Sequence, residues 1–179
     1  PHPVTLVGAA PLSADLLRFA LNFAPKAIAA DGGVNHLRAL GVDPLAVIGD
    51  MDSVALEHQQ LWERNLFVPI AEQDSTDFEK SLARLAAPMI FGVGFLGGRF
   101  DHALAAQTVL VRYPHLKCIL LGSEDIVFLA PPRLSLDLPL ETRLSLFPMA
   151  PVKIISEGLY WPTRSLTFQP DGKVGTSNK

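Results

Sequence analysis

Short apolar segments alternate with longer amphipathic ones from the N-terminus to about residue 122. The apolar segments contain hardly any polar residue, which is typical of strands that are buried on both faces of a parallel sheet. The predicted strands cover residues 4–10, 26–31, 45–50, 66–71, 88–94 and 116–122. Between them, the spacing predicts helices over residues 13–23, 34–40, 54–65, 76–87 and 100–113. This alternation predicts an α/β fold: a mainly parallel sheet with flanking helices.

The pattern changes after Gly122. The segments that follow are strand-like, often alternate apolar and polar residues, and are separated by Pro and Gly rather than by helices. We therefore predict two domains, an α/β domain over residues 1–122 and a small antiparallel β unit over residues 123–179.

Composition and charge exclude several classes of partner. The net charge is −3 and there is no long run of Lys or Arg, which argues against a surface for nucleic acid or an anionic membrane. No apolar stretch is long enough to span a bilayer, and the N-terminus lacks a signal segment, so we expect a cytoplasmic protein. The lone Cys118 lies in an apolar run and is predicted to be a buried hydrophobic residue.

Acidic residues follow four consecutive predicted strands. They are Asp31, Asp50 with Asp52, Asp74 with Asp77, and Asp101. In parallel α/β sheets, ligands bind beyond the carboxyl ends of the strands, so these carboxylates are expected to face the same region.

Each acidic segment also has a purely structural interpretation. Asp50 and Asp52 fit a solvated turn before a helix as well as a Mg²⁺ site. Asp74 and Asp77 fit a helix N-cap and its N3 position. Lys80 shares the helix face of Asp77 near the N-terminus, where the helix dipole disfavours a cation, and this favours a bound anion nearby.

Glycine-rich segments add candidates for phosphate binding. Residues 92–97, GVGFLG, match G-x-G-x-x-G, but after the fifth predicted strand instead of the first, where dinucleotide-binding folds carry it. Arg99 follows at a glycine-rich helix entrance, where a guanidinium suits phosphate oxygens. The glycines of the Asp31-Gly32-Gly33 segment fit a tight turn with positive φ. No Walker A sequence is present.

Taken one at a time, these segments are ambiguous, but helix capping does not require acids to gather at one sheet edge beside cations. The combination favours an acid-rich Mg²⁺ site at which Arg99 and Lys80 are available for phosphate.

Five ordered segments resemble the motifs of the thiamine pyrophosphokinase (thiamin diphosphokinase) family. They are ADGG at 30–33, GDMDS at 49–53, DSTDFEKSL at 74–82, GGRFDH at 97–102 and GTSN at 175–178. The resemblance implies an α/β nucleotide-binding domain, a β-sandwich domain that binds thiamine and mediates dimerisation, and a homodimer with interfacial active sites. It implies transfer of pyrophosphate from ATP to the hydroxyethyl group of thiamine, giving thiamine diphosphate and AMP.

The resemblance also implies a role for each matching residue. Asp50, Asp52 and Asp77 are expected to bind Mg²⁺, and the catalytic set adds Asp74, Arg99 and Asp101. The nucleotide is expected at Asp31, Gly32, Lys80, Gly98, Arg99 and His102. Thiamine is expected at Trp161 and Ser177, with the thiazolium over the indole face. Family members continue beyond the TSN motif with closing strands, so the C-terminal end is expected to be incomplete.

Two other functions fit part of the pattern. The segment VIGDMDSV also matches the aspartate-nucleophile motif of haloacid-dehalogenase-type phosphatases, in which Asp50 would be the nucleophile and Asp52 the acid/base. That motif normally closes the first strand, whereas here it closes the third. The other alternative is a non-catalytic regulator that binds a nucleotide or thiamine, which the intact set of acids disfavours.

Overall fold

The structure is a computed structural model that describes residues 2–54 and 64–179. The chain divides into two compact units, residues 1–129 and residues 130–179, and each is described by itself. The division falls after Leu129 and not after Gly122, because the strand over residues 126–128 joins the first sheet.

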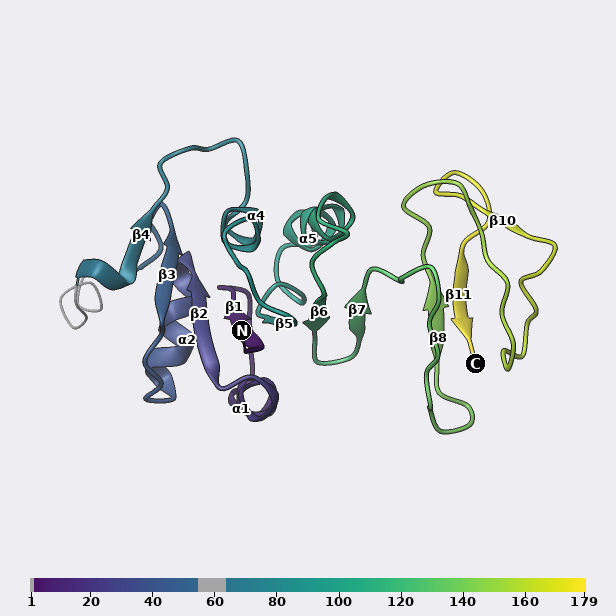
Figure 1. The fold of residues 1–179 in the computed structure, drawn as a ribbon, viewed down its shortest axis with the longest axis horizontal. Helices are drawn as coiled ribbons and strands as arrows, with labels where there is room; N and C mark the ends of the chain where they lie inside the picture. Colours follow the sequence, from purple (N-terminus) through teal and green to yellow (C-terminus); the bar gives the residue numbers. More distant parts are fainter. Residues whose placement is uncertain (1, 55–63) are drawn as a thin grey trace. The chain divides into compact units, whose positions relative to one another are not determined.

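A seven-stranded sheet forms the centre of the first unit (Figure 1), in the order β4-β3-β2-β1-β5-β6-β7. Its strands are β1 (Val4–Val7), β2 (Lys26–Ala30), β3 (Ala46–Gly49), β4 (Phe67–Pro69), β5 (Ile90–Val93), β6 (Cys118–Leu121) and β7 (Ile126–Phe128). The strands from β1 to β6 pair in parallel and β7 pairs antiparallel to β6. The six predicted strands and their parallel arrangement are therefore confirmed.

The helices begin close to their predicted positions. They are α1 (Ala14–Phe23), α2 (Val34–Ala39), α4 (Asp77–Leu82) and α5 (Phe100–Arg112), together with the 3₁₀ turns η1 (Asp31–Gly33) and η2 (Arg64–Leu66). Helix α4 ends at Leu82 and not at the predicted residue 87. The Leu85 N–H donates to Leu82 O, three residues back, which is a turn and not an α-helical bond, and Pro88 disfavours helical backbone at the residue before it. Most of the helix predicted over residues 54–65 lies outside the described residues.

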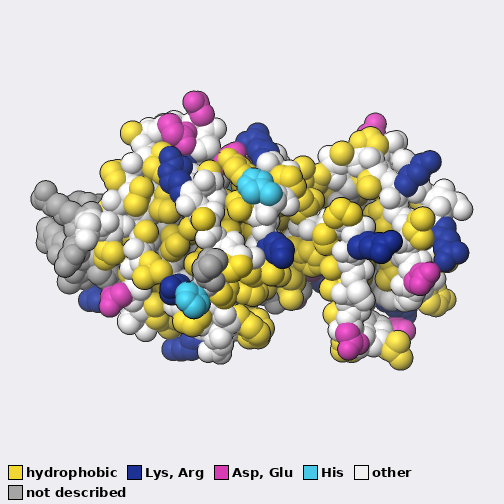
Figure 2. All heavy atoms as spheres, viewed as in Figure 1, with side chains coloured by type: hydrophobic (Ala, Val, Ile, Leu, Met, Phe, Trp, Pro, Cys, Tyr) yellow, Lys and Arg dark blue, Asp and Glu magenta, His cyan; other side chains and the backbone are white. Residues whose placement is uncertain are grey.

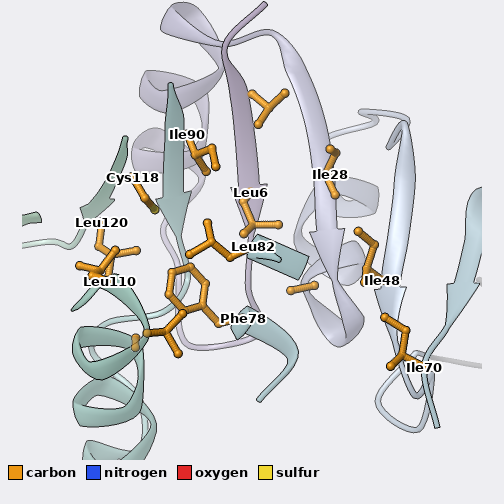
Figure 3. Close-up of a cluster of buried hydrophobic side chains, with 14 residues drawn as sticks. Leu6, Ile28, Ile48, Ile70, Phe78, Leu82, Ile90, Leu110, Cys118 and Leu120 are labelled. Carbon is orange, nitrogen blue, oxygen red and sulfur yellow. The ribbon is translucent and has the colours of Figure 1, made fainter. Parts of the chain in front are cut away.

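Helices cover both faces of the sheet. Helices α1 and α2 pack on one face, through buried residues such as Leu17 and Leu37. Helices α4 and α5 pack on the other, where Phe78, Leu82 and Leu110 contact the strands (Figure 3). Cys118 is buried in this second core, and burial raises the pKa of its thiol to about 12, as expected of an inert hydrophobic residue.

The second unit contains short antiparallel pairs, which confirms the predicted change of architecture. Strand β8 (Leu144–Leu146) pairs with β11 (Gly175–Asn178), and β9 (Val152–Lys153) pairs with β10 (Thr167–Phe168). Residues 133–139, one of the strand-like segments predicted after Gly122, form no strand. Phe168 is buried, whereas large hydrophobic side chains such as Leu140 and Ile155 are exposed. Figure 2 shows hydrophobic side chains on the surface of this unit, among charged and polar ones.

None of the helices within residues 2–54 and 64–179 is long and apolar enough to cross a membrane.

Candidate functional site

The loops at the carboxyl edge of the parallel sheet carry the predicted acids. Asp31 follows β2, Asp50 and Asp52 follow β3, and Asp77 opens α4 after β4. One carboxylate oxygen from each of Asp31, Asp50 and Asp52 lies within 4.8 Å of the others, and we call these three residues the acid cluster. The sheet order accounts for this meeting, because β2, β3 and β4 are neighbours and point the same way.

Asp31 is the buried member of the acid cluster. It is 3% exposed, and its Oδ1 has no hydrogen-bond partner among the described residues. The positive φ expected of the glycines falls on Asp31 itself, at 43°, so that expectation was wrong. Gly33 is required for a different reason: a Cβ on it would lie 1.9 Å from Val7 O. The start of α2 therefore approaches β1 closely, and this places Asp31 at the carboxyl edge of the sheet.

A turn, and not an extended strand, brings Asp50 and Asp52 together. Strand β3 ends at Gly49, Met51 has φ of 68°, and the Asp52 N–H donates to Asp50 Oδ1 over 3.3 Å. A Cβ on Gly49 would lie 2.7 Å from Asp31 Cβ. A glycine before the acid pair is thus what lets Asp31 approach it.

Gln73 is a site residue that sequence reasoning missed. Its side-chain amide donates to Asp50 Oδ2 over 3.0 Å. This hydrogen bond is the main cause that lowers the pKa of Asp50, followed by the Asp52 N–H; Lys80 contributes less. The only signal in the sequence was the position of Gln73, one residue before the DSTD segment.

The entrance of α4 differs from the predicted cap. Thr76 is the N-cap, and its Oγ1 accepts from the Glu79 N–H over 3.2 Å. The assignment of Asp74 as the cap was therefore wrong. Asp74 is exposed, and its backbone N–H donates to Glu72 Oε2 over 2.8 Å. Thr76 satisfies the helix end, and Asp77 follows it in the first turn of α4, where it is close enough for the charges of Asp31 and Asp50 to act on its carboxyl group.

Lys80 lies beneath the carboxylates. Its Nζ is 3.4 Å from Asp77 Oδ1 and 3.8 Å from Asp50 Oδ2, and only 2% of its side chain is exposed. The pKa of Asp77 is raised, mainly because the carboxyl group is partly buried; Lys80 opposes this shift, and the charges of Asp31 and Asp50 add to it.

Arg99 lies at the same sheet edge, after β5. Its guanidinium forms two hydrogen bonds to the Asp101 carboxylate, one of them from Nε to Oδ1 over 3.1 Å. The pair lowers the pKa of Asp101 and raises that of Arg99, and both side chains are exposed, as His102 is. Strand β1 lies between β5 and β2 in the sheet. The loop after β5, which carries Arg99, is therefore two strand spacings, about 10 Å, from the loop after β2, which carries Asp31.

The glycine-rich segment after β5 has a structural explanation. Gly94 has φ of 73°, and a Cβ on it would lie 2.4 Å from Gly8 O at the end of β1. The strand order reverses between β1 and β5, since β2 and β3 continue on one side and β6 on the other. Ligands of open α/β sheets bind at such a reversal. The exposed Gly98 and Arg99 border it.

The thiamine candidates belong to the second unit. Trp161 is 52% exposed, and its indole meets the Tyr160 ring edge to face at 4.9 Å. Its backbone exchanges two hydrogen bonds with the Asn178 side chain. Ser177 has φ of 58°, and its N–H donates to Ser145 Oγ over 3.0 Å.

The acid cluster fits a hard divalent cation. Carboxylate oxygens are the donors that Mg²⁺ prefers, and the buried Asp31 Oδ1 leaves an oxygen available to a cation. A buried carboxylate oxygen without a partner is costly, because nothing replaces the water it has lost. A metal ion in contact with this oxygen would remove that cost.

Comparison with known proteins agrees with the motifs. Residues 18–120 match the family model described as thiamin pyrophosphokinase, catalytic domain. The chain is 31% identical over 155 residues to thiamine pyrophosphokinase 3 of Oryza sativa subsp. japonica, and 27% identical over 154 residues to thiamine pyrophosphokinase 2 of Arabidopsis thaliana. Each match covers 75% of this chain, and the chain spans 58% of the length of either relative.

Solved structures share the fold. The crystal structure of thiamin pyrophosphokinase from Geobacillus thermodenitrificans matches with a TM-score of 0.81 at 24% identity, over 99% of this chain and 87% of that one. The enzyme from Candida albicans also matches with a TM-score of 0.81, at 20% identity, over 99% of this chain and 81% of that one. Since the family's catalytic-domain model covers more than half of the residues, the chain belongs to the thiamin pyrophosphokinase family.

Proposed function

We propose that this chain transfers the pyrophosphoryl group of ATP to the hydroxyethyl group of thiamine, which yields thiamine diphosphate and AMP. The observation that carries the proposal is the acid cluster, with its buried unpartnered Asp31 oxygen, at the ligand-binding edge of a sheet from this family. The negative charge of a polyphosphate substrate must be neutralised at this place by a cation, and the chain supplies the carboxylates that would bind that cation.

The three carboxylates of the acid cluster, Asp31, Asp50 and Asp52, would hold Mg²⁺. Asp77, which was expected as a ligand in place of Asp31, lies outside this cluster, and its carboxylate contacts Lys80, which also contacts Asp50. When bound, the ion would neutralise charge on the transferred phosphates and orient them. The chain's own task at this point is to keep the oxygens converged, which the Met51 turn and the Gln73 hydrogen bond do.

The exposed Arg99 is proposed to bind phosphate oxygens, with Gly98 and His102 beside it. In the reaction, the thiamine hydroxyl oxygen forms a bond to the β-phosphorus, the bond from that phosphorus to the α-phosphate bridging oxygen breaks, and AMP departs. Asp74 or Asp101 is proposed to orient the hydroxyl or accept its proton. Since phosphoryl-type transition states are loose, positioning contributes more than the base.

The second unit is proposed to bind thiamine and to mediate a homodimer with interfacial sites. Its large exposed hydrophobic side chains, among them Leu140 and Ile155, support an interface of this kind. We also propose that the protein works in the cytoplasm. Sedimentation analysis of the chain checks the dimer, and fractionation of the source cells checks the compartment.

Trp161→Ala is expected to raise the KM for thiamine about tenfold and to change kcat little, because it removes a cation–π contact and leaves the ATP site alone. The backbone of Trp161, and not its indole, bonds to Asn178, so truncation keeps those hydrogen bonds. Steady-state kinetics with varied thiamine checks this. Trp161→Phe is the matched control and should recover most of the affinity. An unchanged KM in Trp161→Ala would exclude the stacking role.

The proposed reaction is tested by incubating the protein with ATP and Mg²⁺, with and without thiamine, and resolving the nucleotides. We expect AMP and thiamine diphosphate in equal amounts, only when thiamine is present. ADP as the product would contradict pyrophosphoryl transfer.

The same assay separates the alternatives. Free phosphate released without thiamine would favour the phosphatase that uses Asp50 as its nucleophile. The structure gives this alternative little support, because Asp50 follows β3 and its oxygens already accept from Gln73 and the Asp52 N–H. Binding of thiamine or nucleotide without turnover would favour the non-catalytic regulator.

A further inference from the structure

Lys80 is placed differently from a phosphate ligand. The resemblance put it among the residues for the nucleotide, yet its side chain is only 2% exposed. Carboxylate oxygens of Asp77 and Asp50 lie 3.4 and 3.8 Å from its Nζ. An ammonium group enclosed in this way has almost no surface left for a phosphate oxygen arriving from solvent.

The surrounding charges explain why a cation is needed there. Carboxylate oxygens of Asp31, Asp50 and Asp52 lie within 4.8 Å of one another in the acid cluster. The ammonium group of Lys80 contacts Asp50 of this cluster and also Asp77, so it lies between two of the crowded carboxylates. Ionised carboxylates this close destabilise the fold unless a positive charge lies between them.

We propose that Lys80 is a built-in counter-ion, a positioning residue that keeps Asp50 and Asp77 in place while no divalent cation is bound. Its positive charge repels an arriving Mg²⁺ and does not hold the phosphates. The affinity of the site for the metal is therefore lower than without Lys80, but the carboxylates are already in position before the metal binds. The inference rests on the proposed function for the metal alone and does not depend on which group is transferred.

Its test uses Lys80→Met, which keeps an unbranched side chain and removes the charge. With EDTA present, we expect the melting temperature to fall by about 5 °C or more. Saturating Mn²⁺ should remove most of the difference in melting temperature between Lys80→Met and the parent, because an ion that binds only the folded state stabilises it. Titration followed by the Mn²⁺ electron paramagnetic resonance signal should show binding at least about tenfold tighter than in the parent, since a nearby positive charge has been removed.

Lys117→Met is the matched control, because Lys117 is an exposed lysine of the same unit. It should leave both the melting temperature and Mn²⁺ affinity unchanged. If Lys80→Met does not fold, the double variant Lys80→Met/Asp77→Asn decides the matter. This variant removes one charge of each sign and should recover most of the metal-free melting temperature. A double variant as unstable as the single one would assign Lys80 a packing role and overturn the inference.

Kinetics provides an independent readout. At saturating Mn²⁺, the KM of Lys80→Met for ATP should stay within about twofold of the parent, because no phosphate contact is lost. A rise of about tenfold with unchanged Mn²⁺ affinity would identify a phosphate ligand and overturn the inference. If the parent itself binds no Mn²⁺, the metal part of the proposed function fails. Binding by the parent without AMP formation would overturn only the proposed reaction.

Discussion

Asp52→Asn is expected to lower kcat for AMP formation about a thousandfold, a loss of about 4 kcal/mol in transition-state stabilisation. The substitution replaces an anionic oxygen donor of the acid cluster with a neutral amide. The free energy of unfolding should change by less than about 1 kcal/mol, because Asp52 is exposed and the Ser53 hydroxyl that donates to it can donate to an amide oxygen as well. Single-turnover kinetics and urea unfolding measure the two quantities.

Asp52 gives a cleaner test than Asp50. Asp50 accepts from Gln73 and lies within 3.8 Å of the Lys80 Nζ, so its replacement would change stability and metal affinity together. Asp43→Asn is the matched control, since Asp43 is an exposed carboxylate of the same unit that precedes β3, at the end of that strand opposite to Asp50 and Asp52. It should keep the parent's activity. Parental activity of Asp52→Asn at saturating Mg²⁺ would refute the metal role.

The convergence of the acids was predictable because it depends on topology. Buried strands that alternate with helices pair in parallel, and parallel strands deliver the residues after them to one edge. Asp31 and Asp50 therefore met as expected. The backbone conformation that brings the acids together was not predictable. The sequence left a solvated turn and a metal site open for Asp50 and Asp52, and it gave no sign that a left-handed Met51 turns the chain between them.

Choices between neighbouring polar residues were the least predictable part of the site. Asp74, Thr76 and Asp77 all suit a helix start, and only the structure shows that Thr76 caps α4. Lys80 was expected at the phosphates, because its position on the helix was visible in the sequence and its burial was not. The contact of Gln73 with Asp50 joins residues from the loops after β3 and β4, and no local pattern encodes it.

Gly33→Ala is expected to lower the free energy of unfolding by at least about 3 kcal/mol. The conformation of Gly33, with φ of −57° and ψ of −23°, suits alanine, so backbone strain is not the cause. The cause is a collision, because the new Cβ would lie 1.9 Å from the carbonyl oxygen of Val7. This neighbour is backbone in the centre of the sheet and cannot rotate away.

The same substitution should weaken Mn²⁺ binding in the molecules that still fold. The entrance of α2 must move away from β1, and Asp31, two residues before Gly33, moves with it away from Asp50 and Asp52. Gly41→Ala separates collision from strain: Gly41 has φ of 67° and no atom within 4 Å of the added Cβ, so it should cost only about 1 kcal/mol and leave Mn²⁺ binding intact. Urea unfolding and Mn²⁺ titration of both variants measure these effects. Equal unfolding midpoints for Gly33→Ala and the parent would mean that α2 does not approach β1 as closely as described, and the placement of Asp31 would then need another explanation.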